Sequence, residues 1–256
     1  MDPVPADQQQ PSCDVLADVT ARSRTQADSR ADLAVPDDGG GSSATQRQGP
    51  GRLDLALALA LPLLTLAVAL NGWPVSVDHA VERALPATGT GGPAGVLLLL
   101  ADRLTAAAAP GGTAAVTLGL AAVLGLIRRS FAPLRFAVTR IIMLLVTVLP
   151  TKALLRRPGP PRHPHVSGLH GYFPSGHTAT ALVCTVTVAV LLAERHPRWR
   201  RGLYAAAASW TALVAAGLVL HGDHWLTDIL GALLLGAAII RWTRDTGPAT
   251  ETDTSR

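Results

Sequence analysis

The chain has 256 residues, of which 48% are hydrophobic and only 16% are charged, against about a quarter charged in ordinary soluble domains. Residues 1–52 hold eight of the fifteen aspartates and few apolar side chains, so the remainder is more apolar than the mean hydropathy of +0.31 indicates. These values exclude a water-soluble globular protein. The net charge of +4 is too small and too dispersed to indicate a nucleic-acid partner.

The first 52 residues are rich in Asp, Gln, Ser, Gly and Pro and lack a hydrophobic period, which predicts a disordered cytoplasmic tail. They contain no apolar stretch of the kind found in a cleavable signal peptide. A short polar tail is also predicted for residues 244–256. Cys13, in the N-terminal tail, and Cys184, in an apolar run, indicate neither a disulfide framework nor a metal site.

Apolar segments long enough to approach a bilayer span dominate residues 53–243. In lipid each segment must satisfy its own backbone hydrogen bonds, so these segments are helices. The sequence therefore predicts an all-α fold, an integral membrane bundle of about six helices. The 94–109 segment, interrupted by Asp102 and Arg103, is either a tilted span or an interfacial helix. The other segments are 53–70, 112–127, 134–151, 178–193, 203–220 and 226–241.

The distribution of arginine predicts the orientation, because cytoplasmic loops carry an excess of basic residues. The opposite, extracytoplasmic loops hold Arg83 and a cluster formed by Lys152, Arg156, Arg157 and Arg162. A basic cluster on that side suits the binding of an anion. The loops assigned to the cytoplasm contain Arg47, Arg52, Arg128, Arg129, Arg135, Arg195, Arg198, Arg200, Arg201, Arg241 and Arg244.

Two further expectations concern residues near the ends of the spans. Arg140 lies about two turns into its segment, and we expect its side chain to reach back toward the cytoplasm. Tryptophans near span ends are typical interface anchors, and this chain has four of them. They are Trp73, Trp199, Trp225 and Trp242.

Three short motifs fall on the same predicted face of the membrane. Lys152 with the nearby arginines ends the 134–151 segment, Pro174–His177 precedes the 178–193 segment, and His224–Asp228 precedes the last one. Two crossings separate the second motif from the third, and no crossing separates the first from the second. The topology alone therefore gathers one lysine, several arginines, a serine, two histidines and an aspartate at one interface.

These residue types suit phosphoryl transfer. Ser175 and Gly176 at a helix start offer a hydroxyl and free N–H groups to an anion. His224 and Asp228 are four residues apart, so a helix that includes both would place them on one face. The carboxylate would then hold one imidazole nitrogen protonated and leave the other free to attack phosphorus. His177 would act as the general acid. This chemistry requires no metal and no cofactor.

The motifs resemble the signature of the type 2 phosphatidic acid phosphatase family, membrane lipid phosphatases related to vanadium haloperoxidases. The family pattern is K-x6-R-P, then P-S-G-H, then S-R-x5-H-x3-D. Pro174–His177 matches the second motif fully, and His224 with Asp228 matches the end of the third. The resemblance extends over residues 53–243 and assigns Lys152, Ser175 and Gly176 to phosphate binding.

Two positions depart from the family pattern. Gly159 stands where the first motif has arginine, and Leu218 stands where the third motif has arginine. Losing a charged phosphate contact costs about 2–4 kcal/mol of transition-state stabilisation. Arg157, two residues early, is our candidate replacement for the first arginine, with Arg156 and Arg162 as alternatives. His221 is a candidate donor near Leu218.

The resemblance implies hydrolysis of a lipid phosphate or diphosphate through a phosphohistidine at the outer face of the cell membrane. A polyprenyl diphosphate is the preferred substrate by analogy, with phosphatidic acid and phosphatidylglycerol phosphate as the other possibilities. Two alternatives stay open: phosphoryl transfer to another acceptor, and a degenerate member that binds lipid phosphate without catalysis. A soluble haloperoxidase is disfavoured by the lipid-facing composition of the helices.

Overall fold

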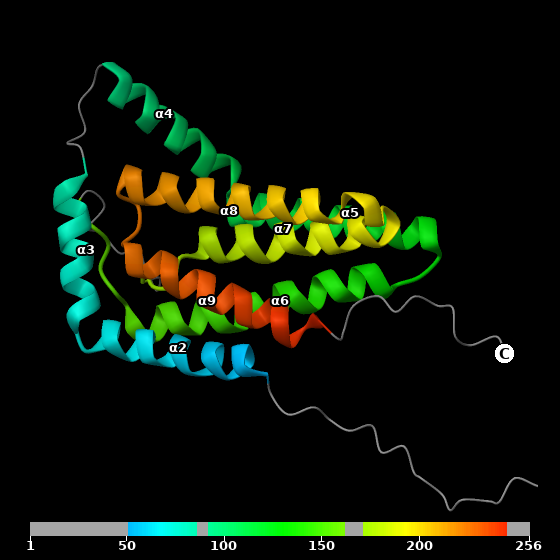
Figure 1. Ribbon diagram of the computed structural model, residues 1–256, viewed down its shortest axis with the longest axis horizontal. Coiled ribbons are helices and arrows are strands. Elements are labelled where there is room, and N and C mark those ends of the chain that lie inside the picture. The colour runs from blue at the N-terminus through cyan, green and yellow to red at the C-terminus, as the bar shows by residue number, and fades with distance from the viewer. Residues whose placement is uncertain (1–50, 86–91, 162–170, 245–256) are drawn as a thin grey trace, which may run out of the picture. The chain divides into compact units, whose positions relative to one another are not determined.

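The computed structural model describes residues 51–85, 92–161 and 171–244, and all of their regular secondary structure is helical (Figure 1). The all-α prediction is therefore confirmed, while nearly all of both predicted tails lies outside the described residues. The helices are α2 (Arg52–Ala69), α3 (Trp73–Ala84), α4 (Gly92–Ala107), α5 (Pro110–Arg128), α6 (Ala132–Leu155), α7 (Gly176–Arg195), η1 (Pro197–Trp199), α8 (Arg200–His221) and α9 (Leu226–Trp242).

Five helical segments are long and apolar enough to cross a membrane, so the chain is a multi-pass membrane protein. Their outward faces carry exposed leucines, such as Leu63, Leu126 and Leu154, as expected where lipid replaces water. The segments are α2, α5, α6, α7, and η1 together with α8. The 17-residue α9 packs against α2, α6 and α7.

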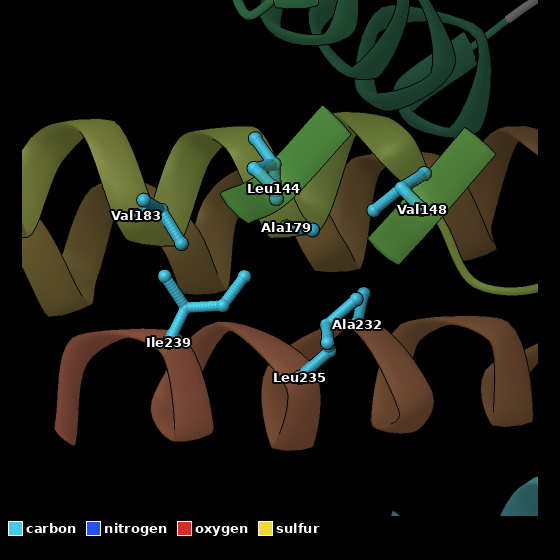
Figure 2. Close-up of a cluster of buried hydrophobic side chains, with 7 residues drawn as sticks. All are labelled: Leu144, Val148, Ala179, Val183, Ala232, Leu235 and Ile239. Carbon is cyan, nitrogen blue, oxygen red and sulfur yellow. The ribbon is translucent and has the colours of Figure 1, made fainter. Parts of the chain in front are cut away.

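Helix α7 lies at the centre of the bundle and contacts α5, α6, α8 and α9. Its alanines and valines are small enough to let these neighbours approach closely. Figure 2 shows one resulting core cluster, in which side chains of α6, α7 and α9 point toward one another. The cluster consists of Leu144, Val148, Ala179, Val183, Ala232, Leu235 and Ile239. This packing fixes the starts of α7 and α9 beside the end of α6.

Helix α3 was not predicted from the sequence, because it is short and only half apolar. Pro74 occupies its first turn, where the missing N–H costs nothing. The helix lies across one end of the bundle and packs on α2 and α9 (Figure 1). Trp73 is 76% exposed on its outer side, whereas Asp78 on the inner side is 1% exposed. A carboxylate is thus buried over the end of the bundle.

Helix α4 corresponds to the interrupted 94–109 segment. Its C-terminal half packs on α8, with Ala101 and Thr105 buried beside Gly217. Its N-terminal half leaves Val96 and Leu99 exposed. The helix is therefore anchored to the bundle by one half only.

Arg140 is buried inside the bundle, with 2% of its surface exposed. Its Nε donates to Thr243 Oγ1 at 2.9 Å and its Nη1 donates to Thr187 Oγ1 at 3.2 Å. The guanidinium also lies 4.1 Å from the centre of the Phe136 ring. The side chain thus reaches toward the end of α9 that is predicted to be cytoplasmic, but it is buried there, because hydroxyls on α7 and beyond α9 satisfy it internally.

Gly231 on α9 makes room for the buried ring of Phe173. A Cβ at position 231 would lie 2.6 Å from that ring, which is fully buried and cannot move aside. We expect Gly231→Ala to lower the free energy of unfolding by about 1–3 kcal/mol, as overpacking does. Thermal unfolding in detergent measures the effect.

Gly236→Ala on the same helix is the matched control. There the atom closest to the added Cβ is Leu182 Cδ2, at 2.7 Å, which is the end of a half-buried aliphatic side chain that can rotate. We expect Gly236→Ala to change the melting temperature much less than Gly231→Ala. Equal losses in the two variants would contradict the proposed contact with Phe173.

Candidate active site

The three motifs meet at one end of the bundle, as predicted. Lys152 lies in the last turn of α6, Ser175 caps α7, and His224 directly precedes the start of α9 at Leu226. Between them is a cavity of about 370 Å³. Its polar side is lined by Lys152, Gly171, Tyr172, Gly176, His177, Thr180 and His224, and its apolar side by Pro110, Leu144, Leu145, Val148 and Leu149.

His224 and Asp228 interact, but not for the predicted reason. Helix α9 starts after His224, so the two residues do not share a helical face. Asp228 instead lies in the first turn, where its Oδ2 accepts from the N–H of Trp225 at 3.1 Å and lies 3.3 Å from His224 Nδ1. The contact directs Nδ1 toward the carboxylate, so Nε2 is the nitrogen left for chemistry in the cavity.

Lys152 reaches the wall of the cavity. Its ammonium donates to the carbonyl of Gly171 at 2.8 Å and to that of Tyr172 at 3.3 Å. The same loop is fixed to the end of α6 by backbone hydrogen bonds from Gly171 to Lys152 and from Tyr172 to Arg157. These contacts hold the ammonium at the cavity, and both of them are made to backbone carbonyl groups.

Ser175 is fully buried and caps α7 through a hydrogen bond from the Thr178 N–H at 3.4 Å. Its own N–H donates to the carbonyl of Asp228 at 3.0 Å, which links the starts of α7 and α9. Gly176 and His177, the next two residues, line the cavity. A helix start presents N–H groups without intrahelical partners, which favours an anion at this point.

Arg157 does not line this cavity. Its guanidinium is 9% exposed and lies between two buried carboxylates, those of Asp228 and Asp78. Nη1 also donates to Thr227 Oγ1 at 2.6 Å. Of the candidate replacements for the missing arginine, Arg156 is exposed at the end of α6, while Arg162 lies outside the described residues.

The two positions that depart from the family pattern are both buried. Leu218 is 1% exposed and belongs to a core cluster with Val214 and Ile229. Gly159 is also buried. His221, the candidate donor near Leu218, has its Nδ1 3.1 Å from Asp223 Oδ2. Neither pattern position therefore carries a cation at the cavity.

Trp225 is a site residue that the sequence assigned to the wrong role. It is 7% exposed, and its Nε1 donates to the carbonyl of Pro158 at 2.9 Å. Its ring meets His79 of α3 edge-on, with centroids 5.0 Å apart. The expectation of an interface anchor is wrong here, because the indole instead fastens the loop after α6 to the start of α9.

Tyr172 is another site residue that sequence analysis missed. Its ring lies 5.5 Å from the His224 ring, in an edge-on arrangement. Burial, aided by the negative charges of Asp223 and Asp228, raises the pKa of the Tyr172 phenol. The phenol therefore stays protonated near neutral pH. Its place two residues before the P-S-G-H motif was the available signal.

A metal site is not evident in the part of the chain that the structure describes. No cluster of three or more His, Cys, Asp or Glu side chains is arranged to hold an ion among these residues. Loop histidines His163, His165 and His170 lie outside them.

Fold and site together define a multi-pass α-helical membrane protein with a histidine–aspartate pair and a lysine at one end of its bundle. Residues 131–249, which include all three motifs, match the family model described as the PAP2 superfamily. This match confirms, over residues 131–249, the resemblance predicted from the motifs.

A solved structure with a similar fold is the transmembrane PAP2-type phosphatidylglycerolphosphate phosphatase from Bacillus subtilis. The two chains share 23% identity with a TM-score of 0.64, and the match covers 75% of this chain and 94% of that one. No curated protein matches the chain. At this identity the likeness establishes the fold.

A substitution at Gly171 tests how closely the loop must approach the end of α6. A Cβ there would lie 2.7 Å from the Arg157 nitrogen and 2.9 Å from the Lys152 carbonyl oxygen, both of which are backbone atoms. We expect Gly171→Ala to push the loop away from Lys152 and to lower the free energy of unfolding by about 1–3 kcal/mol. Denaturant unfolding in detergent measures this loss.

Gly119→Ala provides the comparison, because nothing lies within 4 Å of a Cβ at that position on α5. We expect this variant to be as stable as the wild type or slightly more stable, since alanine favours helix. A Gly171→Ala protein with unchanged stability would show that the loop has room to move.

Proposed function

We propose that the protein hydrolyses a lipid phosphate or diphosphate through a phosphohistidine, without a metal ion. The main observation behind this proposal is the cavity. His224, His177 and Lys152 line one side of it, with Asp228 behind His224, and leucines of α6 line the other side. Such a cavity suits an amphiphile, with its phosphate at the histidines and its hydrocarbon along α6. Leu145 and Leu149 are nearly half exposed, which supports lateral access from the bilayer.

In the first step, His224 Nε2 attacks the terminal phosphorus and the bond from that phosphorus to the leaving oxygen breaks. The leaving oxygen is the lipid oxygen of a monoester or the bridging oxygen of a diphosphate. His177 gives a proton to the leaving oxygen. Asp228 stabilises the positive charge that the His224 ring acquires, through the contact at Nδ1. In the second step, His177 takes a proton from water, the resulting hydroxide attacks phosphorus, and the phosphorus–nitrogen bond breaks. Phosphate leaves and both histidines return to their starting states.

Phosphate binding rests on Lys152, Ser175 and Gly176 in this proposal. Lys152 supplies a positive charge at the cavity, and the start of α7 supplies N–H groups. Arg157, which we also predicted to bind phosphate, has its guanidinium engaged by Asp78 and Asp228, and these contacts favour a different role for it.

The preferred substrate in this proposal is a polyprenyl diphosphate, ahead of phosphatidic acid and phosphatidylglycerol phosphate. The last belongs in any panel because the structural relative from Bacillus subtilis is a phosphatidylglycerolphosphate phosphatase. The buried, uncharged positions Gly159 and Leu218 favour a second candidate function, binding of a lipid phosphate without turnover.

The test is phosphate release by the purified, detergent-solubilised protein from these three lipids in the presence of EDTA. We expect release by the wild type, no detectable release by His224→Ala, and a loss of about 10²–10⁴-fold in His177→Ala. His196→Ala, an exposed histidine between α7 and η1, is the matched control and should retain full activity.

Trapping the intermediate separates the alternatives. Brief incubation with a substrate labelled with ³²P in the transferred phosphoryl group should leave acid-labile, base-stable label on the wild type and none on His224→Ala. Label that passes to an added alcohol in preference to water would favour phosphoryl transfer. Lipid binding by a folded wild type with neither release nor labelling would favour the non-catalytic function.

We further propose that the protein lies in the cell membrane with the cavity on the extracytoplasmic side. Ser76, exposed on α3, and Arg198, exposed on η1, lie at opposite ends of the bundle. In a Cys13→Ser background, we expect a membrane-impermeant thiol reagent to label Ser76→Cys in intact cells, and Arg198→Cys only after permeabilisation. Cys184 is buried and should stay unlabelled. The reverse pattern would invert the topology.

A further inference from the structure

The arginine that we first assigned to phosphate instead joins two carboxylates. Arg157 Nη1 donates to Asp228 Oδ1, and its Nη2 donates to Asp78 Oδ2. Both carboxylates are fully buried, and the guanidinium is 9% exposed. Charged hydrogen bonds shielded from water in this way are among the stronger polar contacts in proteins.

The two oxygens of Asp228 have separate partners. Oδ1 accepts from Arg157, while Oδ2 lies against His224 Nδ1 and accepts from the Trp225 N–H. Any change in the position or charge of Arg157 therefore acts on the carboxylate that orients His224. Of the three charged side chains Asp78, Arg157 and Asp228, only Asp228 contacts His224 directly.

Asp78 holds Arg157 from the other side. Its Oδ1 accepts from the Thr227 N–H at 2.9 Å, and its Oδ2 accepts from Thr227 Oγ1 at 2.6 Å as well as from Arg157. These bonds fix the carboxylate of α3 at the first turn of α9. The guanidinium is thus held between carboxylates that are themselves anchored to α9.

The charges explain why a second acid is needed. With Asp228 as its sole carboxylate partner, Arg157 would neutralise that charge and reduce the stabilisation of a positive His224 ring. With Asp78 present, one guanidinium faces two carboxylates, so the cluster of Arg157, Asp78 and Asp228 keeps one net negative charge. Such a charge favours the ring when it becomes positive in the phosphohistidine.

We propose that Asp78 is a positioning residue for the reaction and acts on His224 through Arg157 and Asp228. This inference rests on the proposed function for its effect on turnover, but its electrostatic part does not. Asp78 does not line the cavity, so its effect should fall on turnover and not on substrate affinity.

We expect Asp78→Asn to lower kcat by about 10–100-fold, as the loss of outer-sphere partners commonly does, with KM changed less than about twofold. Asp54→Asn is the matched control. Asp54 on α2 also pairs with an arginine of α9, Arg241, at 2.8 and 2.9 Å, but at the other end of the bundle. Asp54→Asn should leave kcat unchanged.

A double-mutant cycle separates positioning from a purely structural role in anchoring α3. Arg157→Met removes the group through which Asp78 acts, so adding Asp78→Asn to it should lower kcat no further. An additive loss would instead mean that Asp78 only anchors the helix, and it would overturn the proposal. The double variant also lacks the guanidinium that loses one of its two carboxylate partners in Asp78→Asn, so its comparison with Arg157→Met reports on Asp78 even where Asp78→Asn alone misfolds.

The imidazole of His224 gives a readout that does not need a substrate. Its ¹⁵N signals, assigned by their loss in His224→Gln, can be compared between variants in detergent. The charged or titratable groups that face it are Asp228, Asp223, Lys152, His177 and Tyr172. Asp78→Asn changes none of these, so any shift arises through Arg157 and Asp228.

We expect the ¹⁵N signals of His224 to shift in Asp78→Asn, because the negative charge that acts on the ring through Arg157 and Asp228 is removed, and to stay in place in Asp54→Asn. Unchanged signals in Asp78→Asn would overturn the inference. Shifted signals in a protein that releases no phosphate would instead retain the electrostatic link and reject the proposed function.

Discussion

The buried guanidinium of Arg157 is the contact on which the rest of the site depends. It follows α6, faces α3 through Asp78 and faces the first turn of α9 through Asp228. Without carboxylates a buried guanidinium would be very costly, and without it the two carboxylates would repel each other. The positions of α3, the loop after α6 and the start of α9 are therefore mutually dependent. The orientation of His224 follows from this arrangement.

Helix ends provide the rest of the chemistry. The end of α6 brings Lys152, the start of α7 brings Ser175 and Gly176, and the start of α9 brings Asp228. In a membrane, helix interiors must face lipid or one another, so polar groups concentrate where the helices begin and end. Close packing around α7 then sets these ends side by side, with the apolar wall of α6 continuing from the cavity into the bundle.

The roles and positions of some site residues could be predicted from the sequence, and those of others could not. Pro174–His177 and His224 with Asp228 were recognisable because their spacing is specific, and the structure brings them together. Arg157 was recognisable as a functional arginine, but its partners were not, since Asp78 lies 79 residues away on a helix with no strong sequence signal. Trp225 was misassigned, and the burial of Arg140 was not foreseen, because both depend on neighbouring helices, which periodicity within one segment does not reveal.

The sequence by itself determined that the chain is an all-α membrane protein with motifs that resemble those of the PAP2 superfamily, and which motif residues meet at one end of the bundle. Hydrophobic length and backbone hydrogen bonding are local properties, so composition and motif order were sufficient for this. Only the tertiary structure decided which acid pairs with Arg157, that Leu218 lies in the core, and that His224 meets Asp228 through the first turn of α9. These outcomes depend on contacts between segments far apart in the chain, and packing alone selects among them.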